Sequence, residues 1–308
     1  MSPILWFTAL GLVLAATVAI LWATPAFRRR AARKFATRVG LTLDDGTAPR
    51  VTAQLTRRAL AGLVGYTSGL LVSVGTLLAV GRPTGTDTMW SWVVTGSVFT
   101  GMGIGASLAT LTQRLPQPGA AVRVARSREL VVEDYLTRYE VAFARLVGPV
   151  ALALVALAWI ATSGGPRTEV LLPTATAAAL GTLATQLMFE LGSRLVLRRP
   201  IRGESPHDLA WDDALRADSL RQLLLAPYIL GVVGTGWALF SLMTVLPTTV
   251  GLVVVNLAMP LVVASGIAVL VVVLVRQPER HYLRRLWPDL HAEMLDRERA
   301  IASSASAA

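Results

Sequence analysis

The chain has no cysteine among its 308 residues. Disulfide bonds, thiolate nucleophiles and metal sites with cysteine ligands are therefore excluded. Lysine is almost as rare, since Lys34 is the single example and it follows the first apolar run. A retinal photoreceptor is excluded as well, because its Schiff base requires a lysine amine within the helix bundle.

Motifs that would indicate an enzyme are also missing. His207, His281 and His291 lie outside the apolar runs, and none belongs to an H-E-x-x-H pair. The sequence contains no G-x-S-x-G elbow, no phosphate-binding loop with its lysine and no D-x-[DN]-x-[DN]-G calcium loop. We therefore expect a protein that is not an enzyme and that holds neither a cofactor nor a metal.

Long apolar runs, in contrast, are abundant. A hydrocarbon core about 30 Å thick needs about 20 apolar residues in a helix, and seven runs come close to that length. They are Ile4 to Thr24, Ala59 to Val80, Met89 to Leu111, Leu146 to Ala161, Val170 to Leu191, Leu223 to Val245 and Val250 to Val275. The fourth run is short, so we expect its helix to extend back into 139–145. The sequence predicts an all-α, polytopic transmembrane helix bundle of seven spans, one N-terminal span followed by three hairpins.

Basic residues decide the predicted orientation. Of the 29 lysines and arginines, 27 fall between alternate runs, in 28–58, 114–145, 194–221 and 276–299. Because basic residues near span ends resist translocation, these segments are predicted to be cytoplasmic, with the N-terminus outside and the C-terminus inside. Met1 to Pro3 carry no basic side chain and Arg28 to Arg30 follow the first run, so this run is expected to be an anchor and not a cleaved signal.

The predicted organisation is a transmembrane bundle over 1–275 with cytoplasmic helical loops at 28–58, 114–145 and 194–222. A basic cytoplasmic segment follows at 276–308, and its small, polar end from Ser303 is expected to be disordered. Each cytoplasmic segment is too short to hold a core of its own. We expect the net charge of +10 to face the anionic lipids of the inner leaflet of a plasma membrane, so nucleic acid is not needed to explain it. The preference for arginine suggests a bacterial source.

An acidic motif, L-x-x-[DE]-D, precedes each predicted hairpin. The three copies end in Asp44 and Asp45, in Glu133 and Asp134, and in Asp212 and Asp213. They could form docking sites for a protein partner or a second copy of the chain. Alternatively, they are charges near helix starts that offset neighbouring arginines. Before the third copy, Ser205 followed by Pro206 predicts the N-cap and first position of a helix.

Two ion pairs are predicted along that helix. Asp212 and Arg216 are four residues apart, and Asp218 and Arg221 are three apart, so both pairs are in register.

Few polar groups lie within the apolar runs. Gln186, Glu190 and Arg194 share one helical face in the fifth run, where the ordinary expectation is a Glu190–Arg194 pair at the membrane surface. Asn256 and Pro260 in the seventh run could form a polar site at mid-membrane or a contact between helices.

Two functions follow from these observations. The first is a non-enzymatic subunit or scaffold of a membrane complex, for example a transport complex, that docks partners through its cytoplasmic helices. The second is a small-solute transporter with a polar site in spans five and seven. A carrier requires those polar groups to face one cavity, whereas a subunit buries them in contacts between helices.

Overall fold

A computed structural model describes residues 3–80, 87–112, 129–161, 168–199, 205–245 and 280–306. This part of the chain is helical and has no strand. The ten helices are α1 (Pro3–Ala23), α2 (Pro25–Val39), α3 (Ala48–Val80), α4 (Asp87–Leu111), α5 (Val132–Tyr135), α6 (Arg138–Ala161), α7 (Thr168–Leu197), α8 (Pro206–Val245), α10 (His281–Leu286) and α11 (Pro288–Ser306).

Several of these helices are suited to a membrane. Within the described residues, three helices are long and apolar enough to cross a bilayer, at Ala48–Thr76, Arg138–Ala161 and Pro206–Leu242. A fourth would be added if α1 and α2, which are bent by 85° at their junction, count as one broken span. The first six apolar runs all lie in helices, and α6 starts at Arg138 as predicted for the short fourth run. The seventh run, Val250 to Val275, lies outside the described residues.

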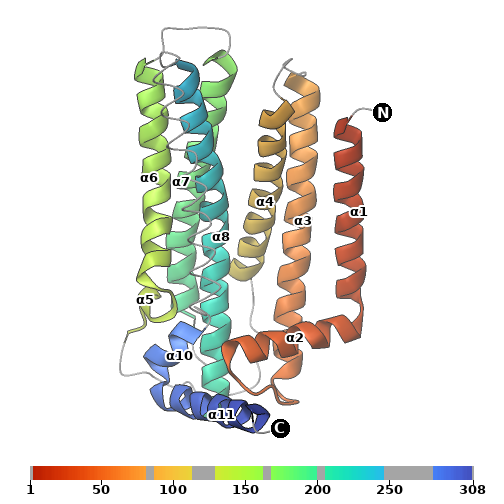
Figure 1. The fold of residues 1–308 in the computed structure, drawn as a ribbon, viewed down its shortest axis with the longest axis vertical. Helices are drawn as coiled ribbons and strands as arrows, with labels where there is room; N and C mark the ends of the chain where they lie inside the picture. Colours follow the sequence, from red (N-terminus) through yellow and green to blue (C-terminus); the bar gives the residue numbers. More distant parts are fainter. Residues whose placement is uncertain are drawn as a thin grey trace.

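The long helices form two groups (Figure 1). Helices α1, α3 and α4 lie side by side, α6, α7 and α8 form the second group, and contacts between α4 and α8 join the two. Small residues permit the closest approaches, because small side chains let helix backbones meet in lipid. A Cβ atom added at Gly65 or Gly101 would overlap with the backbone carbonyl of the other, so α3 and α4 meet directly along this line.

The chain turns sharply after α1. Pro25 occupies the first turn of α2, where its missing N–H costs no helical hydrogen bond, and α2 leaves α1 at 85°. Helix α2 therefore runs across α3 at one end of the bundle (Figure 1). Gly40 ends α2 in the left-handed conformation with a φ of 77°, and the amides of Gly40 and Leu41 both donate to the carbonyl of Ala36.

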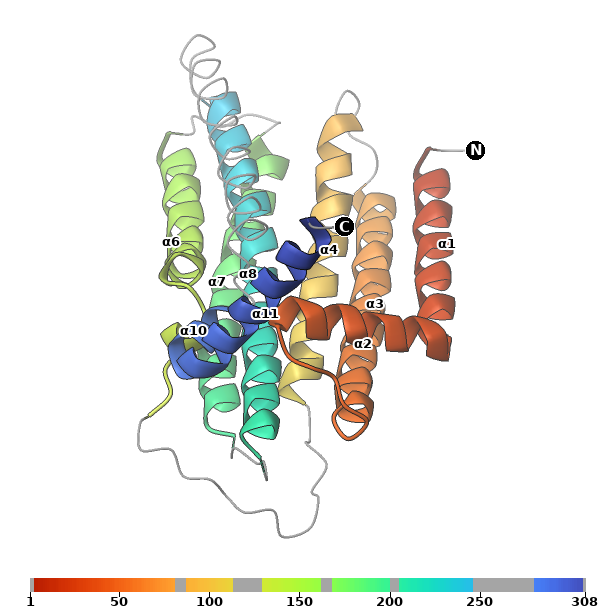
Figure 2. The same cartoon turned by 60° about the horizontal axis from the view of Figure 1, so that its bottom comes forward.

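We call this end of the molecule the charged end; it comprises α2, α5, α10, α11, the described loops beside them, and the adjoining parts of the long helices at 48–58, 138–145, 189–199 and 205–224. Figure 2 brings it forward. Although each segment is short, together they share one hydrophobic core. Its largest fully buried side chains include Trp211, Tyr135, Tyr282, Phe189 and Leu220. Segments that could not form a core singly therefore form one together.

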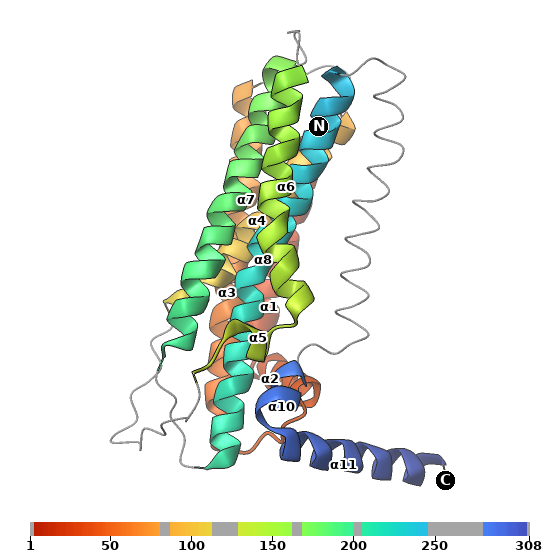
Figure 3. The same cartoon turned by 90° about the vertical axis from the view of Figure 1, so that its left-hand side faces the viewer.

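Helix α11 projects from the charged end (Figure 3). It continues through Ser306, so the described part of the predicted disordered tail, which begins at Ser303, is helical. This part consists of three serines and Ala305, and the Ser303 hydroxyl donates to the backbone carbonyl of Ala300 within the helix. Serine has an intermediate helix propensity and does not break a helix, so α11 continues into the segment that was predicted to be disordered.

Candidate functional site

Asp212 of the third acidic motif is buried between two arginines. Its carboxylate accepts hydrogen bonds from Arg50 of α3 at 2.5 Å and from Arg216, one turn later on α8, at 3.0 Å. Arg216 is itself buried and donates to the backbone carbonyls of Leu197 and Arg199 after the end of α7. The four-residue pairing predicted for Asp212 and Arg216 is confirmed, and the pair also joins three helices.

The adjacent Asp213 joins α8 to two more segments. Its carboxylate accepts hydrogen bonds from the Tyr135 hydroxyl of α5 at 2.8 Å and from the Trp287 indole that follows α10 at 2.9 Å. The side chain is fully buried. The hydroxyl of Tyr282 lies nearby with no hydrogen-bond partner among the described residues. Burial raises the pKa of Tyr282 and the negative charge of Asp213 raises it further, so this hydroxyl stays neutral.

The second motif divides between a buried and an exposed acid. Asp134 is fully buried, accepts a hydrogen bond from the amide of Val131, and lies 3.6 Å from the guanidinium of Arg285. Glu133 is exposed, and its nearest basic group is Arg145 at 3.9 Å. Its backbone carbonyl lies 3.1 Å from the ring nitrogen of His281. The segment that contains α10 therefore contacts both the second and the third motifs.

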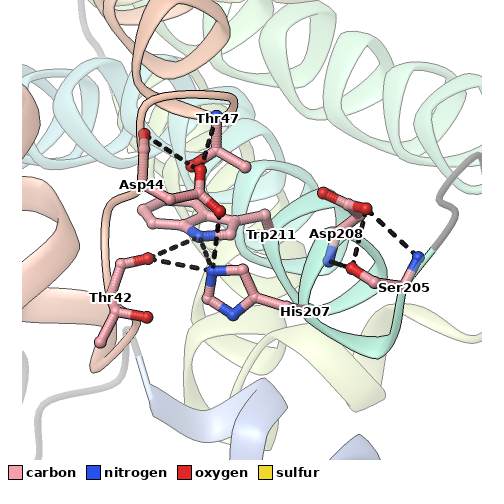
Figure 4. Close-up of polar contacts among 7 residues, drawn as sticks. All are labelled: Thr42, Asp44, Thr47, Ser205, His207, Asp208 and Trp211. Carbon is pink, nitrogen blue, oxygen red and sulfur yellow. Dashed lines mark hydrogen bonds and ion pairs between the residues drawn. The ribbon is translucent and has the colours of Figure 1, made fainter.

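The first motif is the most exposed of the three, and Figure 4 shows its contacts. The Asp44 carboxylate accepts hydrogen bonds from the amide and the hydroxyl of Thr47, and these bonds hold the pKa of Asp44 below its ordinary value. His207 of α8 lies 3.9 Å from Asp44, and both His207 and Trp211 contact the backbone carbonyl of Thr42 at 3.1 Å. Asp45 is exposed as well.

The start of α8 has the predicted cap (Figure 4). The Ser205 hydroxyl accepts a hydrogen bond from the Asp208 amide at 3.1 Å, and the Asp208 carboxylate accepts one from the Ser205 amide at 3.2 Å. Pro206 is the first residue of α8, as expected from the sequence. This reciprocal cap begins the helix that carries the third motif.

Two acids outside the motifs form further pairs between helices. Asp218 of α8 pairs with Arg58 of α3, and Glu140 of α6 lies 3.6 Å from Arg221 of α8. The spacing of Asp218 and Arg221, three residues apart, predicts a pair along α8. In the structure Asp218 pairs with Arg58 of α3 and Arg221 with Glu140 of α6, which packs against α8, so both residues pair across helices.

The polar residues predicted in the fifth run contact α6. Glu190 pairs with Arg145 at 2.7 Å, so among the described ion pairs its partner is on another helix and is not Arg194. Gln186 donates to the backbone carbonyl of Arg145 at 3.0 Å. That carbonyl would normally accept from the amide four residues later, but residue 149 is a proline and has none. Gln186 therefore replaces the hydrogen bond that Pro149 removes.

The role of Pro149 in this contact was not predicted from the sequence. A proline inside an apolar run, with a glutamine on a neighbouring run, is a signal that could have indicated this contact. Of the other two candidates, Asn256 and Pro260 lie outside the described residues, so nothing in the structure tests a polar site in the seventh run.

An apolar groove of about 830 Å³ lies between α3, α4, α7 and α8. Gly65, Gly101, Ile104 and Trp237 are part of its lining, and neither Gln186 nor Glu190 is. The described residues include no group of three or more His, Asp or Glu side chains placed to hold a metal ion.

The chain matches no protein-family model, no curated protein and no solved structure.

Proposed function

We propose that the chain crosses the plasma membrane seven times, with its N-terminus outside and its charged end in the cytoplasm. We further propose that it acts as a non-enzymatic subunit or scaffold of a membrane complex, for example one involved in transport. The distribution of arginine supports the orientation, because the charged end holds the residues that resist translocation.

The contact of Gln186 and Glu190 with Arg145 favours a subunit over a carrier. A solute carrier would direct the polar groups of its spans into a cavity, whereas here both side chains are used to join α6 and α7. One of them also replaces a hydrogen bond lost to proline. Such use is typical of a structural contact between helices in lipid.

The acidic motifs supply the proposed docking surface, but only in part. Asp134, Asp212 and Asp213 are buried and hold the charged end together. Asp44, Asp45 and Glu133 are exposed and remain available to a basic surface of a partner. We therefore assign docking to the exposed acids and a structural role to the buried ones.

The test is copurification from native membranes in mild detergent, with bound proteins quantified by mass spectrometry. The docking variant is Asp44→Asn, Asp45→Asn and Glu133→Gln. The matched control removes three exposed acids of α11, with Asp289→Asn, Glu293→Gln and Asp296→Asn. We expect the docking variant to lose a stoichiometric partner that the native chain and the control retain. Retention of every partner by the docking variant would overturn the proposal.

A further inference from the structure

Helix α2 presents one continuous basic face. Its residues Arg29, Arg30, Arg33, Lys34 and Arg38 are exposed and lie within half of the helix circumference, while Ala32, Phe35, Ala36 and Val39 are buried on the other half. The helix contains no acidic residue. The side chains of Arg29, Arg30, Arg33 and Lys34 form no ion pair with any described residue. Packing against the core explains why the other face of α2 is apolar. It does not explain why these four positive charges lie together on the exposed face.

Both ends of α2 are fixed. At its start, the 85° bend at Pro25 ties it to α1, and the rings of Trp22 and Phe27 meet edge to face across the bend. At its end, Gly40 terminates the helix and the Arg280 guanidinium donates to the carbonyls of Thr37 and Arg38 at 3.3 Å. The basic face is therefore held in one orientation.

The position of α2 coincides with the change from apolar to charged sequence. Its buried face belongs to the same core as Val51 and Leu55 of α3, just before the apolar run that begins at Ala59. Figures 1 and 2 show α2 lying across α3, and α2 leaves α1 at 85°. If α1 and α3 cross a bilayer, α2 lies in the plane of the headgroups, where aromatic rings such as Trp22 are favoured.

We infer that the basic face of α2 is a binding surface for anionic phospholipid headgroups. The inference rests on the proposed membrane placement and is independent of partner docking. Clustered cations at a membrane surface attract anionic lipid. An RNA site would be expected to add exposed aromatic rings for base stacking. Of the two phenylalanines of α2, Phe35 is buried in the core, and Phe27 is partly buried and packs edge to face against Trp22.

The experiment compares the full-length native chain with two charge-matched variants in neutral detergent micelles. One variant replaces Arg29, Arg30, Arg33 and Lys34 with glutamine. The control replaces four exposed arginines elsewhere, Arg198, Arg284, Arg297 and Arg299, with glutamine. Phosphatidylglycerol or phosphatidylcholine is titrated into the micelles, and the bound lipid is counted by native mass spectrometry. A third variant with Arg29→Lys, Arg30→Lys and Arg33→Lys keeps the charge.

We expect the native chain, the control and the lysine variant to bind phosphatidylglycerol in preference to phosphatidylcholine. The α2 glutamine variant should bind phosphatidylglycerol at least about tenfold more weakly, since each basic group near an anionic surface contributes to the attraction. If the glutamine variant does not fold, the pair Arg29→Gln and Lys34→Gln serves in its place, with a proportionally smaller loss.

Equal binding of the two lipids by the native chain would overturn the inference. So would an equal loss in the α2 variant and the control, because the effect would then follow from net charge alone. The competing ligands are a single-stranded RNA and a polyglutamate peptide, added at about 150 mM salt, where the Debye length is about 8 Å. If either binds α2 more tightly than phosphatidylglycerol does, α2 has a different occupant and the inference is overturned. The proposed docking function is tested separately. If the docking variant keeps every partner while the native chain still prefers phosphatidylglycerol, the docking proposal fails and the lipid inference stands.

Discussion

In the apolar part of the molecule, α3 and α4 meet through Gly65 and Gly101, whereas at the charged end helices meet through buried acids, arginines and aromatic rings. The solvent explains the difference. Lipid tails are as apolar as leucine, so helices in lipid gain from close backbone contact more than from apolar burial. At the charged end, burial of Trp211 and Tyr135 removes apolar surface from water, and hydrogen-bonded acids such as Asp213 select which helices meet.

The largest effect is expected at Asp212. Asp212→Ala leaves the buried guanidinium of Arg216 without its carboxylate, and such an unpaired buried charge costs about 3 to 5 kcal/mol. The measurement is the free energy of unfolding in detergent micelles during titration with a denaturing detergent. Asp45→Ala, at an exposed position, is the control and should change it by less than about 0.5 kcal/mol. Equal effects of the two substitutions would show that Asp212 does not stabilise the charged end.

Close packing in the apolar part is tested within one helix. Gly65→Ala places a methyl group against the backbone of α4, where no side chain can move aside, and we expect a loss of about 1 to 3 kcal/mol. Gly75→Ala adds the same group where nothing lies within 4 Å, so it should be neutral or slightly stabilising. A similar loss at both positions would indicate that the α3–α4 contact is not tightly packed.

The contact of Gln186 with Arg145 should have a smaller effect. Gln186→Leu removes a hydrogen bond between helices, with an expected loss of about 0.6 kcal/mol. Pro149→Ala restores an amide able to donate to the Arg145 carbonyl, so the same Gln186→Leu change should cost less in that background. A double-mutant cycle measures the coupling, and a coupling of zero would contradict the role assigned to Gln186.

The smallest effect concerns Asp44 and pH. Its folded-state pKa is held below the ordinary value of 3.8 mainly by the Thr47 hydroxyl, so its charge favours the folded state above that value. This contribution should disappear as pH falls through the folded-state pKa. Asp44→Asn cannot titrate, so the difference in thermal unfolding midpoint between the native chain and this variant should shrink as the pH falls from 5 to 3. A constant difference across that range would contradict the assignment.

Much of the helical architecture could be predicted from sequence, because apolar periodicity and caps act locally. The helix start at Pro206 and the extension of α6 back through 139–145 were both predicted, and both depend on nearby residues. Partners across helices could not be predicted. Arg145 pairs with Glu190, 45 residues away, because α6 and α7 pack together, and nothing in the sequence spacing shows which helices do so.

The acidic motifs illustrate the same limit. Their shared pattern, before each predicted hairpin, identified them as related positions. The pattern could not show which acids are buried, namely Asp134, Asp212 and Asp213, and which are exposed, namely Asp44, Asp45 and Glu133. That division depends on the shared core, to which Tyr282 and Leu283 of α10 contribute from the far end of the chain. Docking through the exposed acids remains a prediction.

The most direct measurement uses the absence of cysteine in the native chain. Single cysteines are introduced at Asp45, Arg198 and Arg297 of the charged end, and at Thr84 and Gly164 in the segments predicted to be outside. Intact cells are then treated with a membrane-impermeant maleimide. We predict that the cysteines at 84 and 164 react in intact cells and that those at 45, 198 and 297 react only after permeabilisation. Reaction of any charged-end cysteine in intact cells would contradict the proposed orientation.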